Sequence, residues 1–164
     1  MIISKIKTGL ALGVKASVSV VLYRLLIKLS MHPVCAITAP VPLGPFFEES
    51  RLAESGLTSV SAWDTSCNLF SYLDISLENE PPNWFDNPIT GENSTSPLLP
   101  WWKISDFVES TGDIKLIWEQ SRMNWVVAFA QRARNGDEKS LKRLNFWLSD
   151  WIESNPPYLG PNWK

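Results

Sequence analysis

The sequence predicts a mainly α-helical protein with a long irregular segment in its middle. Two apolar patterns of helical period, at residues 113–135 and 137–154, follow one another near the C-terminus. A third helical pattern lies at residues 8–30, in a stretch without acidic residues. Between these patterns, clustered prolines exclude long helices and predict irregular structure, in which several tryptophans also lie.

The size and composition of the chain are those of one globular domain. It has 164 residues, of which 45% are hydrophobic, so it can bury a core and wholesale disorder is excluded. The formal net charge of −2 is unevenly distributed, because residues 1–47 hold five bases and no acid, whereas residues 48–164 carry a net charge of −7. This asymmetry predicts that the basic segment pairs either with the acidic body of the protein, the commoner use of opposite charge, or with an external anion.

The first predicted helix runs from Thr8 to Ser30. Thr8 can cap its N-terminus, and Pro33 disfavours helical geometry in the residue before it. One face is apolar at steps of three and four residues, at Leu10, Val14, Val18, Val21, Leu25 and Leu29. The longest run without charge has only 8 residues, at 16–23, whereas roughly 20 span a bilayer. We therefore expect no cleaved signal peptide, and an interfacial helix remains open.

The middle of the chain lacks helical periodicity. We expect residues 1–47 to form a basic helix with a proline-rich connection, residues 48–110 an irregular aromatic-rich segment, and residues 111–164 a helical hairpin. Within the middle segment, apolar runs at 57–63 and 69–77 fit either a short β-hairpin or irregular aromatic packing. A long loop that carries several aromatic residues is expected to wrap a scaffold or to line a site.

The clearest predicted structure is an αα-hairpin at the C-terminal end. Asp113 can cap a helix that ends at Asn135-Gly136, and Asp137 can cap a second helix that stops at Asn155-Pro156-Pro157. The connection of about two residues requires the helices to run antiparallel. Because both apolar faces are wide and rich in tryptophan, we expect further helices to cover them.

Few residues indicate chemistry. Cys35 and Cys67 form no CxxC motif, and His32 is the single histidine, which excludes a multi-histidine zinc site. No phosphate-binding loop, nucleophile elbow or metal motif appears in the sequence. We therefore predict no metal site, no cofactor and no catalytic residue in this chain.

Nine tryptophans are the unusual feature of the composition. An indole face can stack on a pyranose ring, and its N–H can bond a hydroxyl group. We assign to the core the four tryptophans on apolar helix faces, Trp118, Trp125, Trp147 and Trp151. For the four in loops, Trp84, Trp101, Trp102 and Trp163, packing and sugar binding are equally open. Glu119 and Arg122, three residues apart, can form an ion pair, and Arg122 could bind a carboxylate or sulfate if it faces a cleft.

Two ordered motifs resemble the N-terminal helical domain of the heparinase II/III family. They are GDIKLIWEQSR at 112–122 and LSDWIESNPPYLGPNW at 148–163. Shorter segments at 21–33, 44–47, 81–84 and 100–107 resemble the leader of some bacterial members. The resemblance thus covers most of the chain and is weak at 48–80.

The resemblance implies the N-terminal portion of an incomplete α/α toroid. Family members are mostly lyases that cleave uronic-acid-containing polysaccharides by β-elimination. Their catalytic asparagine, histidine and tyrosine residues lie further along the toroid and in the β-sandwich, outside the matched motifs. We expect a truncated fragment of such a lyase, inactive alone. Arg122, Asn162 and Trp163 match motifs near the toroid's cleft and are the expected substrate-binding residues.

Other functions remain open beside this one. The chain could be a non-catalytic module that binds an anionic glycan through its basic helix and loop tryptophans, or a peripheral membrane or interaction protein that uses its basic helix. We expect an anionic polysaccharide as partner, such as alginate or a glycosaminoglycan, and no nucleic acid; a membrane surface is less favoured. The sequence leaves the compartment unknown, although members of the resembled family are often periplasmic.

Overall fold

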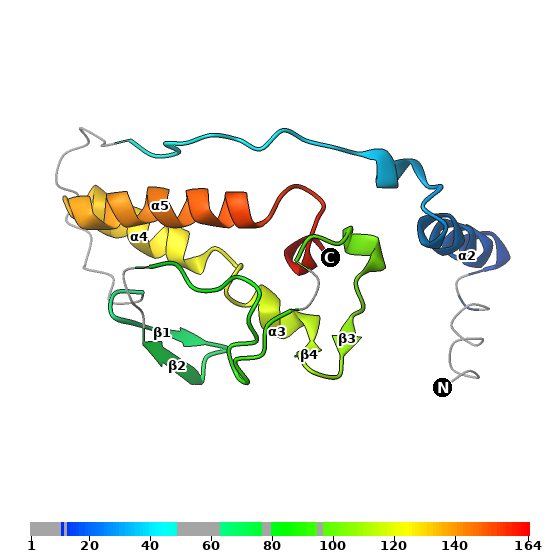
Figure 1. Cartoon of the computed structure of the whole chain (residues 1–164), viewed down its shortest axis with the longest axis horizontal. Helices are drawn as coiled ribbons and strands as arrows, with labels where there is room; N and C mark the ends of the chain where they lie inside the picture. The colour runs from blue at the N-terminus through cyan, green and yellow to red at the C-terminus, as the bar shows by residue number, and fades with distance from the viewer. Residues whose placement is uncertain (1–10, 12, 49–62, 77–79, 95–96) are drawn as a thin grey trace. The chain divides into compact units, whose positions relative to one another are not determined.

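The computed structural model describes residues 11, 13–48, 63–76, 80–94 and 97–164 (Figure 1). The chain divides into two compact units, Met1–Ala39 and Pro40–Lys164. The division falls inside the proline-rich connection predicted from the sequence. The predicted cap Thr8, the stripe residue Leu10 and most of the apolar run at 57–63 lie outside the described residues.

The first unit consists of one α-helix and a short 3-10 helix. Helix α2 spans Val14–Lys28, and the 3-10 helix η1 spans Pro33–Ala36. His32 caps η1, because its Nδ1 accepts a hydrogen bond of 3.1 Å from the Val34 amide. The described part of the first predicted helix is therefore confirmed, and its end before Pro33 follows from the geometry that proline imposes.

Two helices of the second unit, α3 and α5, begin where the sequence signals them, directly after Asp113 and Asp137. Helix α3 spans Ile114–Trp118, α4 spans Asn124–Arg134, and α5 spans Glu138–Ser154. The carboxylate of Asp113 accepts from the Lys115 amide at 3.0 Å, and that of Asp137 accepts from the Lys139 amide at 3.0 Å. Helices α4 and α5 lie side by side, joined through Gly136, whose φ of +90° suits a residue without a Cβ (Figure 1). The predicted hairpin is confirmed.

The expectation of one continuous helix over 113–135 is wrong. The chain leaves helical geometry between Trp118 and Asn124, and Met123 adopts a φ of +61°. The apolar pattern did not reveal this break, because Trp118 and Trp125 lie on either side of it and are seven residues apart, the spacing that one continuous helix would also give. Two buried polar residues in the break bond to distant segments. Glu119 accepts from the Phe70 amide at 3.1 Å, and Gln120 Nε2 donates to the Asp86 carbonyl at 3.3 Å.

Two small antiparallel sheets accompany the helices. Strand β1, Ser66–Leu69, pairs with β2, Leu73–Ser76, and β3, Phe107–Val108, pairs with β4, Gly112–Asp113. Phe70 and Ser71, in the three-residue loop between the paired Leu69 and Leu73, both have positive φ, and the Tyr72 amide donates to the Leu69 carbonyl at 3.2 Å. A short β-hairpin is therefore observed at 66–76, around the second apolar run; the first run lies almost entirely outside the described residues. The described fold combines four α-helices with these two sheets.

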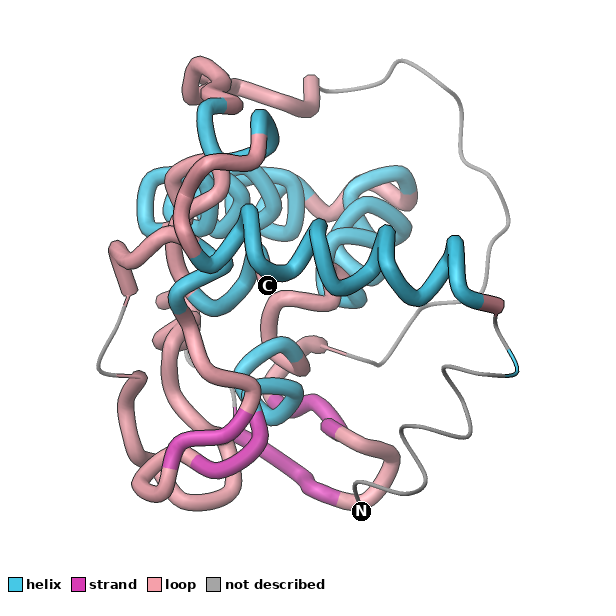
Figure 2. Tube along the Cα trace, turned by 90° about the vertical axis from the view of Figure 1, so that its right-hand side faces the viewer, coloured by secondary structure: helices cyan, strands magenta, loops and turns pink. Residues whose placement is uncertain are grey.

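The core is an aromatic cluster between the hairpin α4–α5 and the loops beneath it. The strands lie on one side of the two helices in both views (Figures 1 and 2). The cluster consists of Trp63, Cys67, Leu69, Trp84, Trp125, Ala128, Phe129, Leu144 and Trp147. Trp125 and Trp147 are fully buried, at 0% exposure. The expectation that further helices must cover these faces is wrong, because Trp84 and strand β1 already cover them.

Replacing Trp147 tests this packing. The Trp147→Ala variant removes the ring that contacts Trp84, Trp125 and Phe129 at centroid distances of 6.2, 5.6 and 5.2 Å. We expect a loss of about 3–5 kcal/mol in the free energy of unfolding, measured by urea denaturation. The neighbouring Phe146, 48% exposed on the same helix, is the matched control, and Phe146→Ala should cost less than about 1 kcal/mol. Equal losses in the two variants would contradict this core.

Candidate functional site

The two family-like motifs contact each other in the structure. The Trp118 indole N–H donates to the Pro161 carbonyl at 2.7 Å. The Trp151 indole N–H donates to the Ser121 hydroxyl at 3.0 Å. Each bond joins the motif at 112–122 to the motif at 148–163. The bonded residues are 43 and 30 positions apart in the sequence, so the two motifs form one cluster.

Asn162 and Trp163 complete the C-terminal end of this cluster. The 3-10 helix η3, Pro161–Trp163, returns toward the end of α5. Asn162 Nδ2 donates to Asn155 Oδ1 at 2.8 Å and to the Trp84 carbonyl at 3.0 Å. The Trp163 indole N–H donates to the Asn155 carbonyl at 3.1 Å. The side-chain donor groups of these two predicted site residues are therefore engaged within the protein, around a buried Asn155.

Asn162 Oδ1 is a buried acceptor for which the described residues supply no hydrogen bond. A buried polar atom without a partner costs about 1–3 kcal/mol. Because the atom is buried, it does not present an accessible acceptor to a sugar. The side-chain nitrogen of Asn162 instead links two parts of the fold, because it bonds Trp84 in the loop at 80–94 and Asn155 at the end of α5.

Gly160 explains why the second motif needs a glycine. Its φ is +82° and its ψ 171°, a region that is essentially open to glycine alone. A Cβ at this position would lie 2.5 Å from the Pro97 carbonyl oxygen. The Gly160 amide donates to the Leu99 carbonyl at 2.8 Å, so the chain at 97–100 lies directly against this turn.

Arg122 is the predicted site residue that keeps an exposed cation. Its Nε lies 2.8 Å from Oε2 of Glu119, and the two side chains are 60% and 6% exposed. The ion pair expected from the spacing is thus confirmed, with a buried acid that orients an exposed base. No bond from the terminal guanidinium nitrogens of Arg122 is seen among the described residues, which leaves a fork suited to a carboxylate or sulfate.

Ser121 connects Arg122 to the other two predicted residues. It accepts from Trp151, and the Trp151 and Trp163 rings lie 6.3 Å apart. The Tyr158 ring lies 5.3 Å from Trp163 on its other flank. The structure therefore brings Arg122, Asn162 and Trp163 into one contact network without direct contact between Arg122 and the other two.

The loop tryptophans separate into core and surface. Trp84 is 2% exposed, and its indole N–H donates to Asp150 at 2.6 Å, so it belongs to the core. Trp101 and Trp102 are half-buried and pack edge to face, with ring centroids 5.7 Å apart. The Trp101 amide donates to the Tyr158 carbonyl at 3.1 Å, which places this pair beside the second motif. These two indoles keep surface that a sugar ring could contact.

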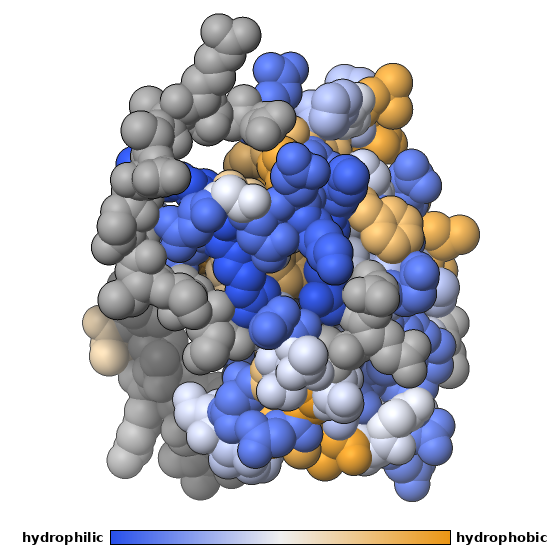
Figure 3. Space-filling view, turned by 90° about the vertical axis from the view of Figure 1, so that its left-hand side faces the viewer, coloured by the Kyte–Doolittle hydropathy of each residue, from blue (hydrophilic) through white to orange (hydrophobic). Residues whose placement is uncertain are grey.

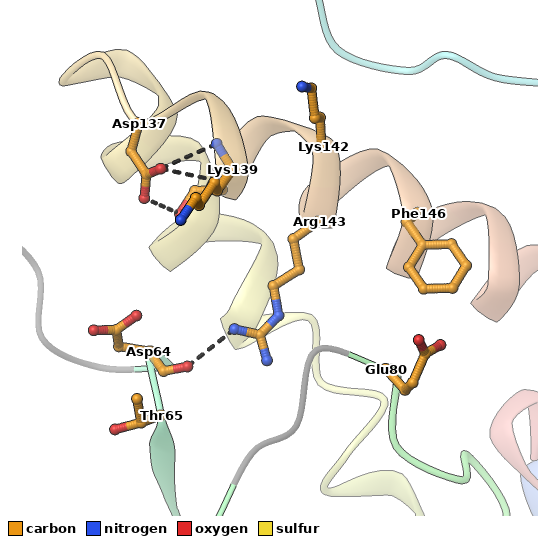
Figure 4. A pocket seen from close by; sticks show the side chains of 9 residues that line it. Asp64, Thr65, Glu80, Asp137, Lys139, Lys142, Arg143 and Phe146 are labelled. Atoms are coloured by element: carbon orange, nitrogen blue, oxygen red, sulfur yellow. Dashed lines mark hydrogen bonds between the residues drawn. The ribbon is translucent and has the colours of Figure 1, made fainter.

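A hollow of about 510 Å³ lies along the first turns of α5. Its charged lining is balanced, with three acids and three bases: Asp64, Glu80, Asp137, Lys139, Lys142 and Arg143. Lys142 points away from Arg143, whereas Arg143 points toward Asp64 (Figure 4). The face of the molecule in Figure 3 is largely hydrophilic, with apolar surface visible between the polar side chains. None of the three predicted site residues lines this hollow.

Arg143 has a structural role at the floor of the hollow. Its guanidinium lies 4.9 Å from the Phe129 ring centroid and 4.6 Å from that of Trp147, and it donates to the Asp64 carbonyl at 2.9 Å. Burial, and secondly the nearby Arg132, lower the pKa of Arg143 from its ordinary value. An arginine remains charged after such a shift, so Arg143 closes the aromatic cluster through cation–π contact.

The remaining titratable groups favour structure over catalysis. The Ser140 hydroxyl, which donates to Asp137 at 2.6 Å, is the main cause that lowers the pKa of the Asp137 carboxyl, as expected for a helix cap. Burial, followed by the charge of Asp74, raises the pKa of the Cys67 thiol to about 11, so it is a poor nucleophile at neutral pH. Among the residues that the structure describes, no three metal-ligating side chains gather.

The sequence did not indicate the hollow or the position of Trp84. Both depend on residues 63–76 and 80–84 packing against α4 and α5, a contact between segments far apart in sequence. The i,i+3 spacing did indicate the ion pair of Glu119 and Arg122, but nothing local indicated that Glu119 is buried. Its bond to the Phe70 amide comes from the β-hairpin turn.

No family model, no curated protein and no solved structure matches this chain. The resemblance to heparinase II/III proteins therefore stands on the quoted motifs.

Alanine at Gly160 tests the turn that joins the motifs. The Gly160→Ala variant must both strain the backbone and displace the Pro97 carbonyl. We expect it to lose about 2–4 kcal/mol in the free energy of unfolding, measured by denaturant titration. Gly91, with a φ of +73° and open space within 4 Å of where a Cβ would lie, is the matched control. Gly91→Ala should cost only about 1 kcal/mol, and a cost equal to that of Gly160→Ala would argue against the close contact.

Proposed function

We propose that this chain is the N-terminal helical portion of a heparinase II/III-like polysaccharide lyase. In this proposal, α4 and α5 are the first hairpin of an incomplete α/α toroid. The observation that carries it is the pair of bonds, from Trp118 to Pro161 and from Trp151 to Ser121, between the two motifs. These bonds support the proposal because they bring the two motifs into one structural cluster, as expected if both belong to one inherited unit.

The proposed contribution of this portion is recognition of an anionic polysaccharide. Arg122 is 60% exposed and is oriented by the buried Glu119, whose second oxygen accepts from the Phe70 amide. Orientation by a buried acid reduces the freedom that an arginine loses when it binds a carboxylate. A uronate carboxylate matches the planar fork of its guanidinium.

The chain alone is proposed not to cleave its substrate. β-Elimination at a uronate requires a group that neutralises the carboxylate, a base for the C5 proton and an acid for the leaving oxygen. His32, the single histidine, lies in the first unit, where its Nδ1 accepts from Val34 and its ring packs against Tyr23. In the resembled family the catalytic residues lie further along the toroid and in the β-sandwich, outside the matched motifs. In this proposal, Arg122 therefore binds substrate while other parts of a lyase perform the elimination.

Two assays on the purified chain test this function. With alginate, heparan sulfate and hyaluronan, we expect no rise in the ultraviolet absorbance of the unsaturated uronate product. With oligosaccharides of the same polymers, we expect salt-sensitive binding by calorimetric titration, weakened about fivefold or more by Arg122→Gln. Arg134→Gln, at an exposed arginine near the end of α4, is the matched control and should change affinity less than about twofold.

Each outcome of these assays has a defined meaning. Sustained product formation would refute the proposed inactivity. Absence of binding to all three polymers, or equal effects of the two arginine substitutions, would refute the role of Arg122. Thermal unfolding of both variants shows whether any loss of binding reflects a loss of folded protein.

One observation favours a second function, that of a non-catalytic glycan-binding module. Trp101 and Trp102 retain exposed indole surface beside the exposed Lys103, an arrangement that can stack on a sugar and pair with its anionic group. Under this alternative, binding survives Arg122→Gln and falls with Lys103→Gln.

A further inference from the structure

Helix α2 carries an apolar stripe that is exposed along its length. The stripe residues Val14, Val18, Val21, Leu25 and Leu29 are 76%, 58%, 66%, 51% and 56% exposed. A shallow groove of about 370 Å³, lined by Ser17, Val18, Val21, Leu22 and Leu25, follows the same face. Five large apolar side chains in a row on one exposed face indicate an interaction surface.

The C-terminal end of α2 packs against the segment that follows it. The Met31 and His32 amides both donate to the Leu26 carbonyl, at 2.8 and 3.2 Å, so the chain turns back on the helix end. The His32 ring packs edge to face on Tyr23, with centroids 4.8 Å apart, and Ile27 is buried. Of the described residues of α2, Ile27 is the one that is buried, and the stripe remains exposed.

Basic residues border the stripe on both sides. On a helical wheel drawn at 100° per residue, Lys28 and Arg24 lie along one edge of the stripe. Lys15 lies along the opposite edge, next to Leu22. Residues 1–47 contain five bases and no acid. Long basic side chains at the edges of an apolar stripe can extend to phosphate groups while the stripe enters an acyl layer.

The length of the helix favours a position in the membrane surface over a crossing. By length and composition alone, the span Val14–Ala36 could cross a bilayer. However, the 15 described residues of α2 extend only about 22 Å, against about 30 Å of hydrocarbon. A crossing would also place Arg24 inside the hydrocarbon, whereas a helix parallel to the surface keeps it at the headgroups.

We propose that α2 binds the surface of an anionic lipid bilayer, with Val14, Val18, Val21 and Leu25 in the acyl layer and Lys15, Arg24 and Lys28 at the phosphates. The charge of the segment and the exposure of its stripe carry this inference, which is independent of the proposed polysaccharide function. Under this proposal, the positive charge of residues 1–47 pairs with an external anionic surface and not with the acidic remainder of the chain.

Cosedimentation of the full chain with lipid vesicles tests the proposal. We expect binding to phosphatidylcholine vesicles that contain phosphatidylserine, and at least about tenfold weaker binding to phosphatidylcholine alone. The Val21→Ser/Leu25→Ser variant should bind the anionic vesicles at least about tenfold more weakly. Val20→Ser is the matched control, because Val20 is also exposed, at 46%, but lies off the stripe, and it should change binding less than about twofold.

Three further results would overturn the proposal. The first is binding without a preference for anionic lipid, or unchanged by the Val21/Leu25 substitutions. The second is self-association of the chain without vesicles in sedimentation velocity, which would assign the stripe to a second copy. The third is either of two findings on the protein in cells. Resistance of the membrane-bound protein to alkaline extraction would indicate a helix that crosses the bilayer. Loss of residues 1–39 from the isolated protein would indicate a segment that is cleaved off.

Discussion

Three indoles meet in the interior of the second unit, and each must satisfy an N–H while it is buried. Trp84, Trp125 and Trp147 form a triangle with centroid distances of 5.6 to 6.2 Å. Trp84 donates to Asp150 on α5, and Trp125 donates to the Gln120 carbonyl. Indole N–H groups need hydrogen-bond partners when they are buried. These two bonds therefore fix the position of the loop at 80–94 against α5 and that of residues 119–123 against α4. Removing any one partner would leave a desolvated donor as well as a gap.

The same requirement explains the C-terminal turn. The indoles of Trp118, Trp151 and Trp163 each donate to a group on another part of the cluster, and the Asn155 amide joins Trp151 to Asn162. Gly160 lets the chain pass within reach of Pro97. Of the three residues predicted to shape a substrate groove, Asn162 and Trp163 therefore hold the fold together, and Arg122 offers a charged group to solvent.

The sequence predicted those parts of the fold that local signals determine. Asp113, Asp137 and Gly136 mark helix ends through bonds or dihedral angles within a few residues, so the start of α3, the start of α5 and the hairpin could be predicted. The break at 119–123 could not, because it depends on bonds from Glu119 and Gln120 to Phe70 and Asp86, about 35 to 50 residues away. The covering of the tryptophan faces by loops could not be predicted for the same reason.

The candidate site was predictable to a similar extent. Spacing predicted that Glu119 and Arg122 pair, but the burial of Glu119 depends on tertiary structure. Composition identified the tryptophans as unusual, but neither the core position of Trp84 nor the surface position of Trp101 follows from the local sequence. In the first unit, periodicity predicted the stripe of α2, and the fold-back at Leu26, which leaves that stripe exposed, emerged only from the structure.

The central claim is that the buried indoles of Trp84, Trp125 and Trp147 hold the second unit together. Thermal unfolding followed by two circular dichroism signals tests it most directly. If the indole cluster closes the core of the second unit, heating the full chain should abolish the near-ultraviolet circular dichroism of its tryptophans and most of the far-ultraviolet helical signal in one cooperative transition, because α3, α4 and α5 hold most of the described helical residues. Persistence of most of the helical signal after the tryptophan signal has gone, or the absence of any tryptophan signal in the native protein, would contradict the account.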